Sequence, residues 1–195
     1  MIDGLVPNDE QHLQSLNEET GRLKHLVDAI EELNQAEASK LSLNRQRLSL
    51  RPFLENIVER YRGSFQEKRV ALGLQCTGEP ELYADPERLS QIVLNLLSNA
   101  LKATGEGGTV SVKVSPIGEE LGITVEDNGS GISEEDLPFI FERFYRGPAG
   151  GLGIGLTIVK ELIGAHGGRI EVKSSPGKGS SFTILLPMEG IHNSS

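Results

Sequence analysis

The stretch DPERLSQIVLNLLSNALKA, residues 85–103, decides the fold. Asp85 is a favourable helix N-cap and Pro86 suits the first helical position, so the sequence predicts a helix that continues to about Ala103. Most of its circumference is apolar, which is the pattern of a helix that covers a sheet.

One face of this helix is polar. Asn95, Asn99 and Lys102 lie at i, i+4 and i+7, within an arc of about 60°. An ordinary solvated face is one interpretation, but Asn is less favourable than Ala in a helix and such faces usually carry Glu or Lys. Amide oxygens can complete the shell of a hydrated Mg²⁺, and an ammonium group can bind a phosphate. Both interpretations remain open from the helix alone.

The segments around this helix predict short strands and further helices. We expect a strand at 48–50, a helix from Pro52 to about Lys68, strands at 70–76, 82–84, 109–115 and 121–127, a helix at 155–166, and a closing hairpin of strands 169–174 and 180–186. They do not repeat as strict βαβ units, so the expected fold class is α/β: a two-layer sandwich of a mixed sheet with helices on one face.

Residues 9–40 predict a long N-terminal helix with a heptad-like apolar seam. The seam needs a partner helix that the neighbouring sequence does not supply. We therefore expect it to pair with a second copy or with a segment outside this chain, and packing on its own domain is the alternative.

Composition limits the function classes. The 195 residues carry 19 basic and 28 acidic side chains, a formal charge of −9, which disfavours nucleic acid as a partner. The single Cys76 cannot form an internal disulfide. No signal peptide or membrane-spanning stretch is predicted, so a cytoplasmic, soluble chain is expected, with a parent protein that can be anchored in the inner membrane. Eighteen of the 23 glycines lie from Gly105 onward, which indicates loops where the backbone approaches something closely.

A carboxylate and two glycines follow the strand at 121–127. Asp127 is succeeded by Asn128, Gly129, Ser130 and Gly131. The Asn-Gly pair favours a hairpin, but residues 133–136, Ser-Glu-Glu-Asp, predict a helix start in place of a returning strand. An acid beside missing side chains suits a flat heterocycle with an exocyclic amine.

A second glycine-rich segment, residues 150–155, opens the helix at 155–166 and predicts an anion site at its N-terminus. The dinucleotide motif G-x-G-x-x-G fails at its third glycine. The P-loop motif also fails, because Gly177-Lys178 is followed by Gly179. No H-R-D or D-F-G tripeptide of a protein kinase is present.

Four segments, in this order, resemble the motifs of bacterial two-component sensor histidine kinases. They are NLLSNALK (95–102) for the N box, DNGSGI (127–132) for the first glycine box, FERFYR (141–146) for the F box and GLGIGL (151–156) for the second glycine box. The resemblance covers about residues 43–187. It implies a GHKL ATPase of the Bergerat type, with ATP between the Asn-bearing helix and a lid.

The resemblance implies roles for residues of this chain. Asn99 would hold Mg²⁺ with support from Asn95, and Asn99, Lys102 and Arg146 would act on the phosphates as the catalytic set. Asp127 would bind the adenine amine. The other expected nucleotide contacts are Gly129, Gly131, Ile132, Tyr145, Gly151, Gly153, Gly155 and Leu156, while Phe141, Phe144 and Tyr145 would anchor the lid by packing.

The same resemblance divides the chain into residues 1–42, the second helix of a dimerisation and phosphoacceptor hairpin, residues 43–189, the catalytic ATP-binding domain, and a tail at 190–195. None of the four histidines has the context of a phosphoacceptor, and His166, before two glycines at a helix end, is placed where positive charge is favoured. We therefore expect a protein-histidine kinase fragment that does not phosphorylate itself. Its implied partners are an acceptor helix elsewhere, a second protomer and a response regulator.

Two departures from the family pattern are visible. Ala103 stands where an aromatic residue often stacks on adenine, and the lid between Tyr145 and Gly151 is short. The alternatives are another GHKL protein, either an anti-sigma-type Ser/Thr kinase or a nucleotide-gated ATPase, and a non-enzymatic nucleotide-sensing dimer.

Overall fold

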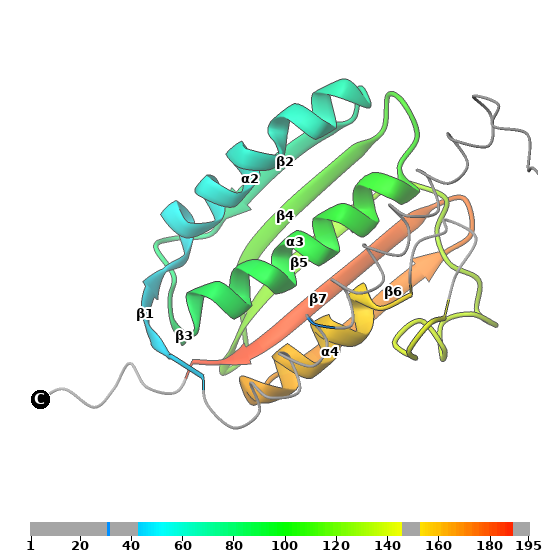
Figure 1. The fold of residues 1–195 in the computed structure, drawn as a ribbon. Helices are drawn as coiled ribbons and strands as arrows, with labels where there is room; N and C mark the ends of the chain where they lie inside the picture. The colour runs from blue at the N-terminus through cyan, green and yellow to red at the C-terminus, as the bar shows by residue number, and fades with distance from the viewer. Residues whose placement is uncertain (1–30, 32–42, 146–152, 189–195) are drawn as a thin grey trace, which may run out of the picture.

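The computed structural model describes Glu31, residues 43–145 and residues 153–188. Within this part of the chain a five-stranded sheet has the order β2-β4-β5-β7-β6, with helices on one face (Figure 1). The strands are β2 (Ala71–Cys76), β4 (Thr109–Ile117), β5 (Glu120–Asp127), β6 (Arg169–Ser175) and β7 (Gly179–Pro187). The covering helices are α2 (Leu50–Glu67), α3 (Pro86–Ala103) and α4 (Gly155–Ala165). A separate two-stranded ladder joins β1 (Gln46–Ser49) to β3 (Glu81–Ala84).

The sheet is mixed, as the sequence predicts. β2 pairs with β4 in parallel, and all the other pairs in the sheet are antiparallel. The α/β sandwich with helices on one face is therefore confirmed. The predicted helix at 9–40 and the tail at 190–195 lie outside the described residues, apart from Glu31.

Alternation along the strands explains why only one face is covered. In β4, Val110, Val112 and Val114 are buried under the helices, whereas Ser111 and Lys113 are partly exposed on the opposite face. Because successive side chains of a strand point to opposite faces, each strand supplies one apolar and one polar row. The apolar row and the helices form one continuous core.

The N-terminus of α3 is capped as expected. Oδ1 of Asp85 accepts hydrogen bonds from the backbone N–H groups of Glu87 (3.0 Å) and Arg88 (3.1 Å). These bonds satisfy two of the donors that a helix start leaves without a partner. The predicted bounds of this helix agree with the structure.

Asp85 also joins three segments. Its Oδ2 accepts from the N–H of Asn44 (2.9 Å), and its own N–H donates to Nε2 of His166 (3.1 Å) just after α4. Nδ1 of His166 lies 2.8 Å from the carbonyl oxygen of Leu162. Since Nε2 accepts, the proton of the neutral ring sits on Nδ1 and both ring nitrogens have partners.

Burial contradicts the expectation of positive charge at His166. The side chain is 3% exposed, and desolvation lowers its pKa. Protonation would also set Nε2–H against the N–H of Asp85. Local helix-end electrostatics is therefore overridden by tertiary burial.

The helix start predicted at residues 133–136 is also wrong. The N–H of Asp136 does bond to Oγ of Ser133 (3.1 Å), as in a cap, but turns follow it and no α-helix forms. Pro138 lacks a backbone donor and disfavours helical geometry at the preceding residue, which explains why the turn does not propagate.

A stability measurement tests the state of His166. Because its folded pKa is lowered, the unfolded chain binds more protons, so this contribution to stability is complete above about pH 6.5 and is lost as pH falls below it. We expect His166→Gln, which retains an acceptor and does not titrate, to lose less free energy of unfolding than the wild type between pH 7.5 and 5.5 in urea titrations. Equal losses would contradict a neutral buried ring.

Candidate functional site

The carboxylate predicted to recognise a ligand lies at the end of β5. Asp127 is 5% exposed, and Oδ1 accepts a hydrogen bond from the N–H of Gly129 (2.9 Å). Burial raises its pKa, and bonds from the backbone N–H groups of Gly129 and Ser180 oppose that rise. The carboxylate of Asp127 is therefore buried and accepts hydrogen bonds from backbone N–H groups.

The loop after Asp127 is wedged between α3 and the β6–β7 turn. The N–H of Ser130 donates to the carbonyl of Ala103 (3.1 Å), and the N–H of Gly177 donates to the carbonyl of Ser130 (2.7 Å). Ile132, two residues after Ser130, donates its N–H to Oγ of Ser174 (2.8 Å). Loop 128–132 is thus bonded on both sides.

Two glycines in this loop are required by space. A Cβ on Gly129 would lie 2.4 Å from the carbonyl oxygen of Ala103, and one on Gly131 would lie 2.0 Å from that of Ser175. Gly131 also has φ of +69°, which L side chains rarely adopt. The sequence predicted that these glycines let the backbone come close to another group. In the structure, that group is the backbone of neighbouring segments of the same chain.

The start of α4 lies against Asn95 of α3. A Cβ on Gly155 would be 2.9 Å from Oδ1 of Asn95, whose Nδ2 donates to the carbonyl of Gln91 (3.1 Å). Leu156 packs on the core. The polar stripe of α3 and the glycine-led start of α4 are consequently neighbours, as the anion-site hypothesis requires.

Asn99 and Lys102 continue that stripe. Asn99 is partly exposed, and its side chain makes no hydrogen bond to any described residue. Lys102 is exposed at the last turn of α3. Nζ of Lys68 donates to the carbonyls of Leu101 (2.6 Å) and Lys102 (3.1 Å), which fixes this helix end. An amide and an ammonium group are thus available beside the loop.

Tyr145 and Gly153 border the lid segment. The hydroxyl of Tyr145 donates to Asp136, which lowers the pKa of that carboxyl and raises the pKa of Tyr145. Gly153 has φ of +71°, and its Cβ would lie 2.4 Å from the carbonyl of Tyr145. The carbonyl of Gly153 accepts from the N–H of Phe144 (2.8 Å). Tyr145 is therefore held by packing on the core and by its bond to Asp136.

Arg146 and Gly151, two of the predicted phosphate-contacting residues, lie outside the described residues. The structure adds three contributors that the sequence patterns did not indicate. A Cβ on Gly179 would lie 1.9 Å from the carbonyl of Asp127, Oγ1 of Thr157 donates to the carbonyl of Phe141 (3.1 Å), and Ser174 holds Ile132. Of these three residues, only Thr157 could have been identified from the sequence, because a hydroxyl on an otherwise apolar helix needs a hydrogen-bond partner when it is buried.

The chemistry of these residues fits a nucleotide. Asp127 can accept from an amine, the start of α4 offers backbone N–H groups of the kind that bind anions, and Asn99 offers an amide oxygen. No group of three or more His, Cys, Asp or Glu in the described part of the chain could hold a metal alone. The amide oxygen of Asn99 could supply one ligand of a hydrated Mg²⁺.

Comparisons with known proteins agree with this geometry. Residues 84–190 match the family described as histidine kinase-, DNA gyrase B-, and HSP90-like ATPases. A circadian input-output histidine kinase, CikA of Synechocystis, is 35% identical over 197 residues, which cover 96% of this chain and 26% of the relative. This chain therefore spans about a quarter of that protein.

Two solved structures share the fold. Full-length ShkA in complex with AMPPNP is 29% identical with a TM-score of 0.80, over 94% of this chain and 39% of that one. The histidine kinase ThkA in complex with the response regulator protein TrrA is 22% identical with a TM-score of 0.75, over 94% and 53%; this likeness shows the fold alone.

Two glycine substitutions separate the effect of space from that of backbone conformation. Gly131 (φ +69°) and Gly167 (φ +77°) have similar conformations, but only at Gly131 would a Cβ collide with the backbone. We expect Gly167→Ala to cost about 1–2 kcal/mol of unfolding free energy for its conformation. Gly131→Ala should cost clearly more in urea titrations. Equal losses would show that loop 128–132 has room for a side chain.

Proposed function

Since this chain belongs to the family of histidine kinase-, DNA gyrase B-, and HSP90-like ATPases, we propose that it transfers the γ-phosphoryl group of ATP to a histidine of a phosphoacceptor helix. In this proposal it works as the catalytic ATP-binding part of a sensor histidine kinase. The observation that carries the proposal is the buried Asp127, held between the end of α3 and the β6–β7 turn, with the polar stripe of α3 leading from it to the start of α4.

Asp127 would recognise the adenine. Backbone N–H groups occupy part of its acceptor capacity, and the remainder can accept from an exocyclic amine. Gly129 and Gly131 would form the adjoining wall, and Ile132, half-buried after them, would contact the ring. Because Ala103 supplies no aromatic ring that could stack on adenine, Asp127 would be the main determinant of adenine recognition.

The phosphates would lie along α3 toward α4. Asn95 sits at the start of α4, and Asn99 would hold Mg²⁺, which supplies charge neutralisation on the phosphates when bound. Lys102 and Arg146 would add positive charge. Gly151, Gly153, Gly155 and Leu156 would present backbone N–H groups, and Tyr145 would hold the lid segment beside them.

The acceptor histidine and the partners lie beyond this site. We propose that residues 1–42 belong to a dimerisation hairpin, that residues 43–189 form the catalytic domain, and that the acceptor helix is supplied by another segment or protomer. We propose a response regulator as the final phosphate receiver, because the ordered motifs resemble those of two-component sensor histidine kinases. None of the helices among the described residues has the length and hydropathy of a membrane span. We propose a cytoplasmic location for this part of the protein, because ATP is available there.

Substitution of the buried acid tests the nucleotide site. Asp127→Asn should weaken binding of an ATP analogue with Mg²⁺ at least about tenfold in calorimetry, because an amide nitrogen would face the amine donor. Glu126→Gln, one residue earlier on the polar face of β5, should bind normally.

Although Asp127→Asn should bind the ATP analogue more weakly than the wild type, it should not be less stable. The pKa of Asp127 is raised by burial, so its charged form is disfavoured in the fold, and this penalty grows as pH rises through the folded pKa. We therefore expect the Asn variant to unfold at a urea concentration no lower than the wild type at pH 7.5. Unchanged analogue binding would overturn the assignment of Asp127.

A phosphotransfer assay tests the reaction. The chain alone should not label itself with radioactive γ-phosphate, because its histidines lack the acceptor context, but it should label a separately supplied acceptor hairpin. The product should be labile in acid, as a phosphohistidine is. An acid-stable product would favour the Ser/Thr kinase alternative, and hydrolysis without any labelling would favour a nucleotide-gated ATPase.

A further inference from the structure

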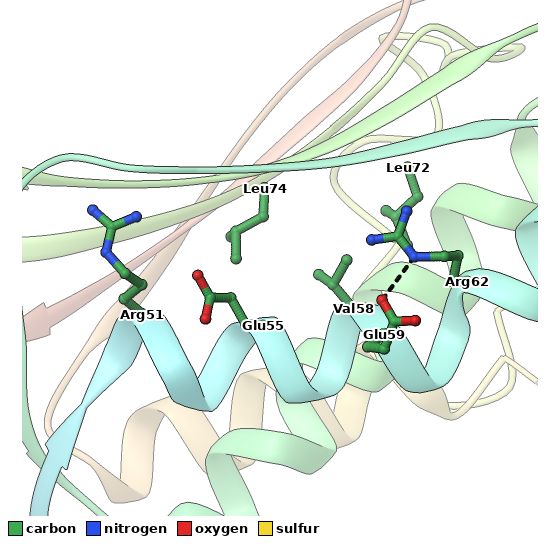
Figure 2. A pocket seen from close by; sticks show the side chains of 7 residues that line it. All are labelled: Arg51, Glu55, Val58, Glu59, Arg62, Leu72 and Leu74. Atoms are coloured by element: carbon green, nitrogen blue, oxygen red, sulfur yellow. Dashed lines mark hydrogen bonds and ion pairs between the residues drawn. The ribbon is translucent and has the colours of Figure 1, made fainter.

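A groove remote from the nucleotide site runs between α2 and the outer side of β2 (Figure 2). It has a volume of about 270 Å³ and is lined by Arg51, Glu55, Val58, Glu59, Arg62, Leu72 and Leu74. In Figure 2 Leu74 points from the strand toward the helix beside Glu55, and Leu72 lies next to Arg62. Its floor is apolar and its rim is charged.

The groove adjoins a row of outward-facing backbone groups on β2. β2 is at one end of the sheet order, and its inner side pairs with β4 through the N–H groups of residues such as Ala71 and Thr77. Because strand groups alternate in direction, the N–H groups of Leu72, Leu74 and Cys76 face outward. The carbonyl of Cys76 confirms this direction, since it accepts from Nη2 of Arg51 (3.0 Å).

The two edges of the sheet are protected differently. The exposed positions of β6 carry Arg169, Glu171 and Lys173, and charges of this kind discourage the pairing of further strands. The exposed positions of β2 carry Ala71, Gly73 and Gln75, none of them charged. β2 is therefore the edge strand whose own exposed side chains carry no charge that an added strand would bury.

The charges on the rim select among occupants. Arg51 pairs with Glu79 (2.7 Å) and Arg62 pairs with Glu59 (2.8 Å), whereas Glu55, between them, has no ion pair with a described residue. A strand laid in the groove would therefore gain most from a Lys or Arg beside Glu55.

A second copy of this chain fits poorly. The order Arg51, Glu55, Glu59, Arg62 along α2 reads almost the same in both directions, so an antiparallel second copy of α2 centred on it would place like charges opposite one another. This pattern favours a different chain over a symmetric dimer through β2.

We propose that the edge of β2 is a docking site for an extended segment of a partner protein. The segment adds a strand beside β2, places alternate apolar side chains over Leu72 and Leu74, and brings one basic side chain to Glu55. This site is separate from the nucleotide site and does not depend on the proposed kinase activity.

Nuclear magnetic resonance of the full ¹⁵N-labelled chain tests the proposal. The probe is an end-blocked nine-residue peptide of alternating valine and threonine with one central lysine on the valine face. We expect it to shift the amide signals of Leu72, Leu74 and Cys76 and to slow their hydrogen exchange, while the signals of β6 remain unchanged.

Charge exchange supplies the control. Glu55→Lys should weaken binding of the lysine peptide by about threefold to tenfold and strengthen binding of a matched peptide with glutamate in its place. Glu171→Lys, on the other edge, should change neither. No shift at β2, or equal binding by the Glu55 variant, would overturn the proposal. A concentration-dependent dimer with protected β2 amides would also overturn it, because the occupant would then be a second copy.

Discussion

Close contact between backbone segments around Asp127 is the constraint on which the rest of the structure depends. The carbonyl of Asp127 leaves no space for a Cβ at Gly179, and the carbonyls of Ala103 and Ser175 leave none at Gly129 and Gly131. The last turn of α3, the end of β5 and the β6–β7 hairpin therefore meet at distances that only glycine allows. This contact buries the carboxylate and surrounds it with N–H donors, so the same packing that closes the fold also creates its acidic recognition group.

The helices are held at two places along their length. Asp85 caps the start of α3 and bonds to His166 just after the end of α4, and Asn95, in the middle of α3, lies against Gly155 at the start of α4. These contacts leave little freedom for α4 to move along α3. The amide stripe and the glycine-led helix start are thus presented as one surface, which is the arrangement that positioning of phosphates requires.

Local signals predicted much of this fold. The cap at Asp85 and the apolar periodicity defined α3 correctly. The ordered motifs identified an ATPase of the kind that includes histidine kinases, and the match over residues 84–190 to histidine kinase-, DNA gyrase B-, and HSP90-like ATPases confirms that family. Signals that depend on distant residues failed. Ser133 was predicted to begin a helix, but Pro138 prevents the helix from continuing. His166 was predicted to favour positive charge, but its burial lowers its pKa. The need for Gly179 arises from a contact with Asp127, 52 positions away in the sequence, and no local pattern shows it. The roles assigned to Asn99, Lys102 and Arg146 stay predictions.

The burial of Asp127 also bears on which purine the proposed site would accept. An ionised carboxylate can only accept hydrogen bonds, and Asp127 accepts two of them from the backbone N–H groups of Gly129 and Ser180. Adenine would present an amine to it, whereas guanine has a carbonyl oxygen at the same ring position, which would place acceptor against acceptor. In a water-poor environment such a mismatch costs the desolvation of two unpaired groups, which water at a surface site would relieve. The same burial that makes the charge unfavourable for stability would therefore give the site its preference for adenine.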